Sequence, residues 1–376
     1  MSRIVLFGAT GYTGELTARA LVDRGEKPVL AARSRDKLER LADELDVGLE
    51  IAEADVSRPA SVRALVERGD VLVSTVGPFV RWGGPAVHAA VATGAHYIDS
   101  TGEPEFIREV FERHGRGAEA AGCGLVTAFG YDWVPGNLAG ALAVREAGEA
   151  ATRVDVGYFM TGSAGAGDMS GGTRASAAGA VVSPSFAWRG GRLVTERGAR
   201  RVRAFAVGGK DRQAISVGSS EHFALPHLAP QLREVNTYLG WFGPLSRPMQ
   251  VQSAALSVVT RIPGSRGALD RLVGVLVKGS TGGPDEHERA RSASQVVAAA
   301  YDAAGRQLSE MVLEGVNGYT FTGRFLAWAA QRAADSGLQG TGALGPADAF
   351  GVDRLERGVA EAGIERSSDQ PPATSD

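Results

Sequence analysis

The stretch Ile4-Val5-Leu6-Phe7-Gly8-Ala9-Thr10-Gly11-Tyr12-Thr13-Gly14 decides the fold of this chain. Its first four residues are apolar and predict a buried strand, and Glu15 to Val22 then predicts a helix. Unpaired N–H groups at a helix N-terminus bind phosphate, and glycine lets the backbone approach it. A purely structural turn is the alternative, because the G-x-x-G-x-x-G spacing departs from G-x-G-x-x-G. The residues expected to contact a dinucleotide here are Gly8, Thr10, Gly11, Tyr12, Thr13 and Gly14.

Composition limits the class of protein. The 376 residues allow one large or two ordinary domains, and a formal net charge of −3 argues against a general nucleic-acid binder. The single cysteine, Cys123, rules out an internal disulfide and a cysteine-based metal site, so we interpret it as a packed residue. We expect no signal peptide, because the first predicted strand begins at Ile4, and no transmembrane helix, because no run of ~18 apolar residues occurs. We expect a cytoplasmic protein without a metal.

The second predicted strand, Pro28 to Ala32, indicates which dinucleotide is bound. In dinucleotide enzymes the residue after this strand reads the adenosine ribose, where a carboxylate suits NAD and an arginine suits the 2′-phosphate of NADP. Here Arg33 follows the strand, Ser34 and Lys37 lie close behind, and no acid precedes them. We therefore predict NADP(H), bound by Arg33, Ser34 and Lys37. A solvated helix start with Ser34 as N-cap is the alternative.

The third and fourth predicted strands add further cofactor contacts. Leu49 to Ala54 ends at Asp55 and Val56, where the Asp55 carboxylate can accept from the adenine amino group or cap the helix that follows. Val71 to Val76 lies beside the first strand in a doubly wound sheet, so its carboxyl end meets the pyrophosphate and the nicotinamide ribose. The contacts expected from that end are Thr75, Val76, Gly77, Pro78 and Phe79.

The fifth and sixth predicted strands, His96 to Asp99 and Leu125 to Ala128, end at the same edge of the sheet. The pattern predicts an α/β fold with a Rossmann-type doubly wound parallel sheet. The titratable residues that this topology places at its edge are Asp99, Glu103, Tyr131 and Asp132.

Several motifs resemble the saccharopine dehydrogenase-like family, and within it the actinobacterial trans-acting enoyl reductases. The motifs are Gly8-Ala-Thr-Gly-Tyr-Thr-Gly14, Val76-Gly-Pro-Phe79, Gly94-Ala-His-Tyr-Ile-Asp99, Thr101-Gly-Glu-Pro-Glu-Phe106, Gly130-Tyr-Asp-Trp-Val-Pro135, Ser170-Gly-Gly-Thr173 with Ser176, Tyr319-Thr-Phe-Thr322 and Pro346-Ala-Asp-Ala-Phe-Gly351. The resemblance implies an NADP-binding Rossmann domain and a second mixed α/β domain. It does not supply an agreed catalytic residue for the enoyl reductase branch.

The domain boundaries follow from the change of pattern. We expect a Rossmann domain over 1–130, with C-terminal helices from about 335–365 packed back on it. Residues 131–334 would form a substrate or dimerisation domain, and 367–376 a disordered tail. Alternating stretches and two hairpin signals, at Gly190-Gly191 and at Asp302-Ala-Ala-Gly305, predict a largely antiparallel sheet in the second domain.

Two features of the second half could bear on partners. Arg197, Arg200, Arg201 and Arg203 form a basic cluster, which is either a solvated strand face or a contact for the phosphates of a carrier-bound substrate. Residues 239–278 predict two apolar helices split by Pro263-Gly264. They would form core or a homodimer surface, or else an entrance for acyl chains or a peripheral membrane contact.

The hypothesis for function is NADPH-dependent reduction of a carbon–carbon double bond in an unsaturated acyl thioester, free or carrier-bound. Tyr131 is the candidate hydrogen-bond and proton donor, with Asp132 orienting it or lining the site. An aromatic wall is the alternative role for Tyr131. Two rival functions remain: a saccharopine dehydrogenase-like C=N oxidoreductase on an amino-acid substrate, and a non-catalytic NADP-binding or membrane-associated scaffold.

Overall fold

The computed structural model describes residues 2–162, 184–259 and 282–367. The chain divides into two compact units. The first unit comprises Met1–Gly102, Phe106–Val134 and Gly318–Ile364. The second comprises Glu103–Glu105, Pro135–Asn317 and Glu365–Asp376.

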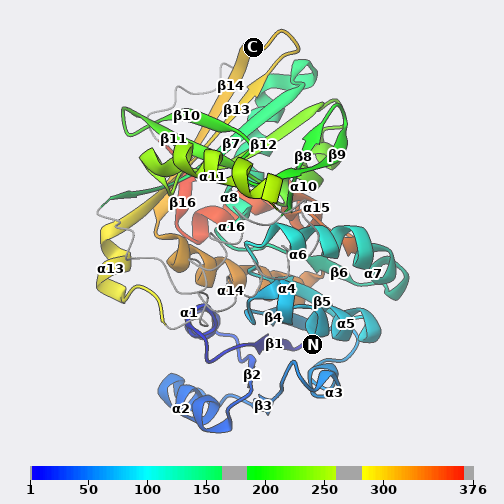
Figure 1. Ribbon diagram of the computed structural model, residues 1–376. Coiled ribbons are helices and arrows are strands. Elements are labelled where there is room, and N and C mark those ends of the chain that lie inside the picture. Colours follow the sequence, from blue (N-terminus) through cyan, green and yellow to red (C-terminus); the bar gives the residue numbers. More distant parts are fainter. Residues whose placement is uncertain (1, 163–183, 260–281, 368–376) are drawn as a thin grey trace. The chain divides into compact units, whose positions relative to one another are not determined.

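The first unit is built on a seven-stranded parallel sheet in the order β15-β6-β5-β4-β1-β2-β3 (Figure 1). The chain moves outward from β1 to β3 and then crosses to β4 on the other side of β1, which confirms the doubly wound Rossmann-type sheet. The strands are β1 Ile4–Phe7, β2 Val29–Ala32, β3 Ile51–Glu53, β4 Val71–Ser74, β5 His96–Asp99, β6 Gly124–Val126 and β15 Gly342–Ala343.

Helices connect the strands of the first unit. The helices are α1 Tyr12–Asp23, α2 Arg35–Leu45, α3 Pro59–Arg63, α4 Phe79–Trp82, α5 Gly84–Thr93, α6 Pro104–Glu109, α7 Gly115–Ala121, α14 Gly318–Ser336, α15 Pro346–Phe350 and α16 Val352–Glu361. A π-helical turn, Val110–His114, separates α6 from α7. Among the C-terminal helices, α15 and α16 are separated at Gly351, whose φ of 76° favours glycine.

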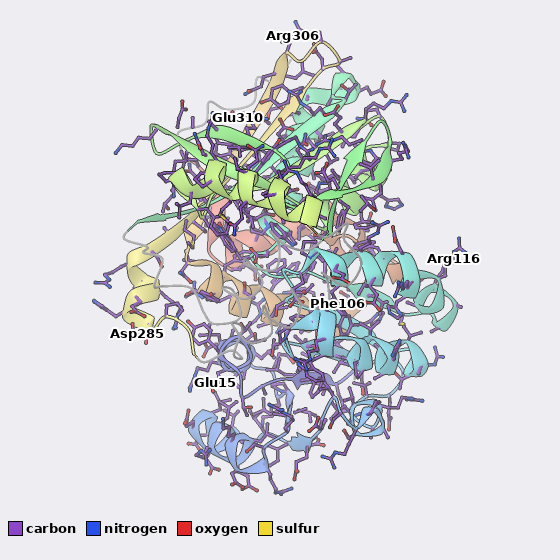
Figure 2. The ribbon with its side chains drawn as sticks, in the orientation of Figure 1. Glu15, Phe106, Arg116, Asp285, Arg306 and Glu310 are labelled. Atoms are coloured by element: carbon purple, nitrogen blue, oxygen red, sulfur yellow. The ribbon has the colours of Figure 1, made fainter. Side chains whose placement is uncertain are left out.

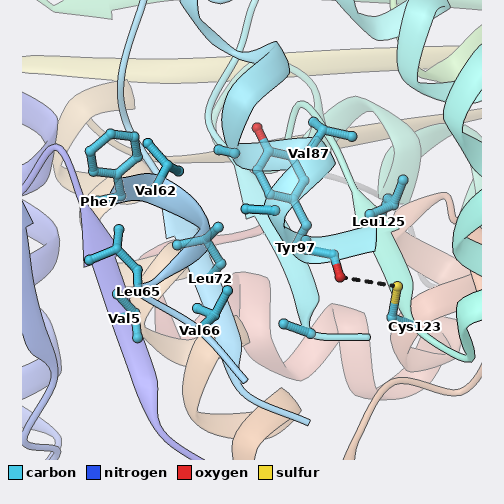
Figure 3. Packing of buried hydrophobic residues seen from close by; sticks show 14 of the residues in the cluster. Val5, Phe7, Val62, Leu65, Val66, Leu72, Val87, Tyr97, Cys123 and Leu125 are labelled. Carbon is cyan, nitrogen blue, oxygen red and sulfur yellow. Dashed lines mark hydrogen bonds between the residues drawn. The ribbon is translucent and has the colours of Figure 1, made fainter. Parts of the chain in front are cut away.

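The core of the first unit lies between the sheet and its helices (Figure 3). Strand residues such as Val5 and Leu72 pack against helix residues such as Val87, and all three are fully buried. Cys123 is part of this cluster, and burial raises the pKa of its thiol. A buried thiol with a raised pKa is a poor nucleophile, so the geometry agrees with a packing role. Phe106 on α6 also faces inward, with its ring 5.6 Å from that of Phe79 (Figure 2).

The second unit is built on a nine-stranded, largely antiparallel sheet, as expected. Its main path runs β10-β11-β12-β7-β13-β14-β16, and β7 pairs with β12 in parallel. Both predicted hairpins form: β8 and β9 turn at Gly190 and Gly191, which have positive φ, and β13 pairs with β14. The strands are β7 Arg153–Gly162, β8 Pro184–Arg189, β9 Arg192–Arg197, β10 Val202–Val207, β11 Lys210–Val217, β12 Glu234–Leu239, β13 Ser292–Tyr301, β14 Gln307–Val316 and β16 Ile364–Arg366.

Within the described residues, the α-helices that accompany this sheet are α8 Val134–Ala147, α10 Glu221–Leu228, α11 Ser246–Val259 and α13 Glu286–Arg291. Helix α11 corresponds to the first of the two apolar helices expected over 239–278. The second apolar helix, the motif at 170–173 with Ser176 and almost all of the expected tail lie outside the described residues.

Helix α14 groups with the first unit, although the sequence pattern placed residues up to 334 in the second domain. The physical reason is close packing against α1. A Cβ atom added to Gly323 would lie 2.9 Å from Leu16 Cβ, so only glycine allows the two helices to approach this closely.

Candidate functional site

The glycine turn after β1 forms a tight cradle. Gly8 has a φ of 92°, and the N–H groups of Gly8 and Ala9 donate to Ala31 O at 2.8 and 3.2 Å. A Cβ atom on Gly14 would overlap the carbonyl oxygen of Gly8, and one on Gly8 would lie 2.6 Å from Thr75 Oγ1. Side chains at these positions would therefore clash with the turn itself and with Thr75, so glycine allows the backbone to fold this tightly.

Helix α1 begins directly after this turn. Its N-cap is Gly11, and no side chain caps the helix. The first-turn N–H groups of a helix lack intrahelical partners, so they are available to an anion. Thr10, Tyr12 and Thr13 are half-buried around this end, and Glu15 is exposed on the helix (Figure 2). The cradle and the helix end together fit the phosphates of a dinucleotide.

The cationic side chains that follow β2 differ in whether they form ion pairs. Arg35 forms ion pairs with Glu39 at 2.8 Å and Glu53 at 3.8 Å. Arg33 and Lys37 are exposed, and the structure shows no ion pair for either within 2–162, 184–259 and 282–367. Ser34 is the N-cap residue of α2, but its side chain makes no capping hydrogen bond. Ser34 thus stands at the N-cap position that the alternative expected, without a capping hydrogen bond from its side chain, and its contact with a phosphate beside Arg33 remains a prediction.

Asp55 shapes the loop after β3. Its Oδ1 accepts from Ser57 N at 2.8 Å, and this hydrogen bond lowers the pKa of the Asp55 carboxyl. The N-cap residue of α3 is Arg58, so Asp55 does not cap that helix. Val56 beside it is half-buried and packs against the core of the unit. An ionised Asp55 remains suited to accept from an adenine amino group.

The loop after β4 meets the glycine turn at the crossover of the sheet. Thr75 donates from its hydroxyl to Gly8 O at 3.1 Å and from its N–H to Phe7 O at 2.9 Å. Gly77 and Pro78 are exposed, Val76 is half-buried, and Phe79 is buried. The two predicted cofactor stretches therefore lie together at the switch point.

Asp99 joins the carboxyl ends of β5 and β6. Its carboxylate accepts from Thr101 N at 2.8 Å, Ala128 N at 2.9 Å and the Thr127 hydroxyl at 2.7 Å. Full burial raises the pKa of Asp99 to about 6, and these hydrogen bonds oppose the rise. Glu103, the other acid expected nearby, is half-buried and belongs to the second unit.

Asp132 follows β6 in the same region. Burial raises the pKa of its carboxyl to about 7, and its buried Oδ1 has no hydrogen-bond partner within the described residues. A Cβ atom on Gly102 would lie 2.9 Å from Asp132 Oδ2, so the loop after β5 touches this carboxyl. Asp132 is therefore a carboxyl group that can hold a proton near neutral pH.

Tyr131 is buried between the end of β6 and the start of α14. Its N–H donates to Thr322 Oγ1 at 2.9 Å, and a Cβ atom on Gly318 would lie 2.9 Å from its ring. Phe321 packs edge-on against it, with ring centroids 6.4 Å apart. Its ring therefore packs against the start of α14, and the two expected roles of Tyr131, hydrogen-bond donor and aromatic wall, both stay predictions.

The start of α14 supplies residues that the candidate site of the sequence analysis does not include. Tyr319 packs edge-on against Tyr12, with ring centroids 5.3 Å apart, while Thr322 binds Tyr131 N. One helical turn thus touches both the glycine turn and the loop of Asp132. The only signal in the sequence was the motif Tyr319 to Thr322, which strand and helix patterns alone do not connect to the N-terminal domain.

Comparison with known proteins identifies the first unit. Residues 4–124 match the family model described as saccharopine dehydrogenase NADP binding domain. These residues form a saccharopine dehydrogenase NADP-binding domain. The predicted resemblance is confirmed over this region, and the match of its NADP-binding domain indicates NADP(H) as the cofactor. The glycine cradle and the N-terminus of α1 fit that cofactor, as does Arg33, for which the described part of the chain shows no ion pair.

Curated relatives are similar to this chain over part of its length. The chain is 39% identical over 140 residues to a trans-acting enoyl reductase of Mycobacterium leprae, covering 36% of this chain and 34% of the relative. It is 36% identical over 140 residues to a trans-acting enoyl reductase of Mycobacterium ulcerans, with the same two coverages. The matched region thus spans about a third of the length of these relatives.

A solved structure shares the fold along the chain. Saccharopine dehydrogenase (L-Glu forming) from Saccharomyces cerevisiae superimposes with a TM-score of 0.60 at 12% identity, covering 98% of this chain and 99% of that one. This match confirms the fold class: a Rossmann-type domain joined to a mixed α/β domain with a largely antiparallel sheet.

The arginine cluster outside the NADP-binding domain is engaged within its own unit. Arg201 pairs with Glu196 through two nitrogens, and Arg203 pairs with Asp155. Arg197 donates to Gln250 O at 3.1 Å, and Arg200 is exposed. These contacts engage the arginines within the second unit, and a contact of the cluster with substrate phosphates stays a prediction.

Proposed function

We propose that the protein is an NADPH-dependent enoyl reductase that reduces the carbon–carbon double bond of an unsaturated acyl thioester from lipid or polyketide metabolism. Two findings support the proposal: the NADP-binding domain, and the similarity of 36–39% over 140 residues to proteins named trans-acting enoyl reductase. Whether the thioester is free or carrier-bound is part of what must be tested.

The reaction needs a hydride at the β-carbon and a proton at the α-carbon of the thioester. Bound NADPH supplies the hydride. The chain must hold the thioester oxygen, where negative charge develops, and must deliver the proton. The products are then the saturated thioester and NADP⁺, so atoms and electrons balance.

Asp132 is the proposed general acid that delivers this proton. Its carboxyl has a pKa raised to about 7 by burial and an oxygen without a partner in the described structure, so it is partly protonated at neutral pH. General acids work best when their pKa lies near the working pH. Tyr131 beside it would donate its O–H to the thioester oxygen. Water then reprotonates Asp132 after turnover.

The test is oxidation of NADPH by the purified protein, followed by the loss of NADPH absorbance. Crotonyl-CoA serves as enoyl thioester, and an imine formed from a 2-oxo acid and an amine serves as the rival substrate. Oxidation that depends on the thioester and falls about a hundredfold or more in Asp132→Asn supports the proposal. Oxidation with the imine alone would establish the C=N reaction instead. Binding of NADPH without oxidation by either substrate would establish a scaffold.

The expected contacts of the apolar segment remain predictions. At the described end of this segment, Leu245 and Val251 are 61% and 69% exposed. No helix within the described residues is long and apolar enough to span a membrane. As part of the proposal, this surface contacts a membrane or a second copy of the chain. Co-sedimentation with anionic vesicles, and sedimentation velocity without them, distinguish the two contacts.

A further inference from the structure

Asp99 forms hydrogen bonds with both of the loops that surround Asp132, the loop after β5 and the loop after β6. Asp99 Oδ1 accepts from Thr101 N and Ala128 N, and Oδ2 accepts from the Thr127 hydroxyl. Its backbone carbonyl also accepts from Phe129 N at 2.6 Å. One fully buried residue therefore fixes the position of the loop after β5 relative to the loop after β6.

Each of these loops forms one side of the environment of Asp132. The loop after β5 continues from Thr101 to Gly102, where an added Cβ atom would lie 2.9 Å from Asp132 Oδ2. The loop after β6 turns at Ala128 and closes on itself, because Trp133 N donates to Ala128 O at 3.0 Å. Asp132 thus lies within a turn whose first residue is bound to Asp99.

The backbone at Ala128 needs such a restraint. Its φ is 60°, in the left-handed region that a residue with a side chain rarely occupies. A strained residue of this kind persists only where its surroundings hold it. Here the N–H groups on both sides of the strained Cα atom donate to Asp99: Ala128 N donates to Oδ1, and Phe129 N donates to the backbone carbonyl.

We propose that Asp99 is the positioning residue for Asp132, because its carboxylate clamps the two backbone segments that keep the Asp132 carboxyl buried and aligned. Asp99 acts through hydrogen bonds rather than by contact with the substrate. This positioning role adds a residue to the site of the proposed enoyl reductase. It rests on the proposed activity only for its expected effect on kcat.

The test is the titration of Asp132 in the full-length protein with NADP⁺, followed by ¹³C NMR of labelled aspartate carboxyls. The Asp132 signal is assigned by its loss in Asp132→Asn. In Asp99→Ala the loops relax and water enters, so we expect the acid dissociation constant of Asp132 to rise about tenfold or more toward that of an ordinary aspartate. Asp99→Asn retains acceptors for the two N–H groups and should largely restore the wild-type titration.

Asp70→Ala is the matched control. Asp70 is also a buried carboxylate that accepts three hydrogen bonds, from Arg3 N, Arg3 Nη2 and Glu67 N, but it lies at the start of β4, at the other edge of the sheet. Its loss should lower stability without moving the titration of Asp132. An unchanged Asp132 titration in Asp99→Ala, or an equal change in Asp70→Ala, would overturn the inference. If Asp99→Ala does not fold, Thr127→Val removes one bond of the clamp, and a smaller change in the same direction is then required.

A kinetic measurement separates this inference from the proposed function. Asp99→Ala should lower kcat for thioester reduction about tenfold or more while the Kd for NADPH stays constant, because the glycine turn is unaffected. If the wild-type protein reduces no thioester but the Asp132 titration moves as expected, the function fails and the positioning role stands. If reduction is observed and the titration does not move, the positioning role alone fails.

Discussion

Arg33 and Arg35 differ in what they are free to bind, although they are two residues apart. Arg35 is paired with Glu39 and Glu53, whereas Arg33 has no ion pair in the part of the chain that the structure describes. A hydrogen bond to a charged group is worth about 1.5–3 kcal/mol. We predict that Arg33→Ala raises the Kd for NADPH roughly tenfold or more and leaves that for NADH nearly unchanged.

Arg35→Ala is the control for that prediction, measured by titration calorimetry with both cofactors. It removes the same charge from the same end of β2, but the side chain that it removes is already paired with Glu39 and Glu53. Its effect on NADPH should therefore be several times smaller. Equal losses in the two variants would mean that general electrostatics, and not a 2′-phosphate contact, sets the preference.

Asp132 should make the stability of the protein depend on pH. Its folded pKa of about 7 lies above the ordinary aspartate value of about 3.9, so the protonated form favours folding. This contribution is fully present below about pH 4 and is lost as the pH rises through about 7. We predict that Asp132→Asn is more stable than wild type at pH 8, by a few kcal/mol at most, and that the difference vanishes near pH 4.

Urea unfolding at a series of pH values measures this difference. Asp99, with a pKa raised to about 6, adds a slope of the same sign, so the comparison must be made between variant and wild type at each pH. A difference that does not change between pH 4 and pH 8 would contradict the raised pKa of Asp132.

At the scale of elements, the contact between α1 and α14 supports the cofactor site. Gly323 lies against Leu16, and Tyr319 lies against Tyr12 at the glycine turn. Gly323→Ala forces the helices apart, which typically costs about 1–3 kcal/mol in a packed region. We predict a lower melting temperature and weaker NADPH binding for this variant, measured by thermal unfolding with and without cofactor.

Gly84→Ala is the matched control on α5. A Cβ atom there meets nothing within 4 Å, and the φ of Gly84 is not positive. Replacing glycine by alanine at such a site stabilises a protein by about 0.4–1 kcal/mol through the unfolded chain. The packing argument fails if Gly323→Ala is as harmless as Gly84→Ala.

Elements with strong local patterns were predictable from the sequence. The strands from Ile4, Val71 and His96 are short apolar or β-branched runs bounded by turns, and each forms close to its expected place. The π-helical turn at Val110–His114 has no such pattern, because it depends on packing rather than on local propensity.

At the scale of the whole molecule, the sequence predicted the edge of the sheet where the site lies but not all of its members. The order of strands places Gly8, Thr75, Asp99 and Asp132 at one edge, since parallel strands all end there. Thr322 comes to Tyr131 from 191 positions away, and no periodic pattern carries that contact. The hydrogen bonds of Asp99 likewise depend on the backbone of Ala128. Its φ is positive, and the sequence does not predict this because alanine rarely adopts such a conformation.

The most direct measurement is the position of the transferred hydrogen. The protein is given crotonyl-CoA with NADPH deuterated at C4 of the nicotinamide, and the product is examined by mass spectrometry and NMR. The account predicts butyryl-CoA with one deuterium at the β-carbon. In D₂O with unlabelled NADPH it predicts one deuterium at the α-carbon, with turnover that depends on Asp132. No saturated thioester, or deuterium found only in an amine formed from an imine substrate, would contradict it.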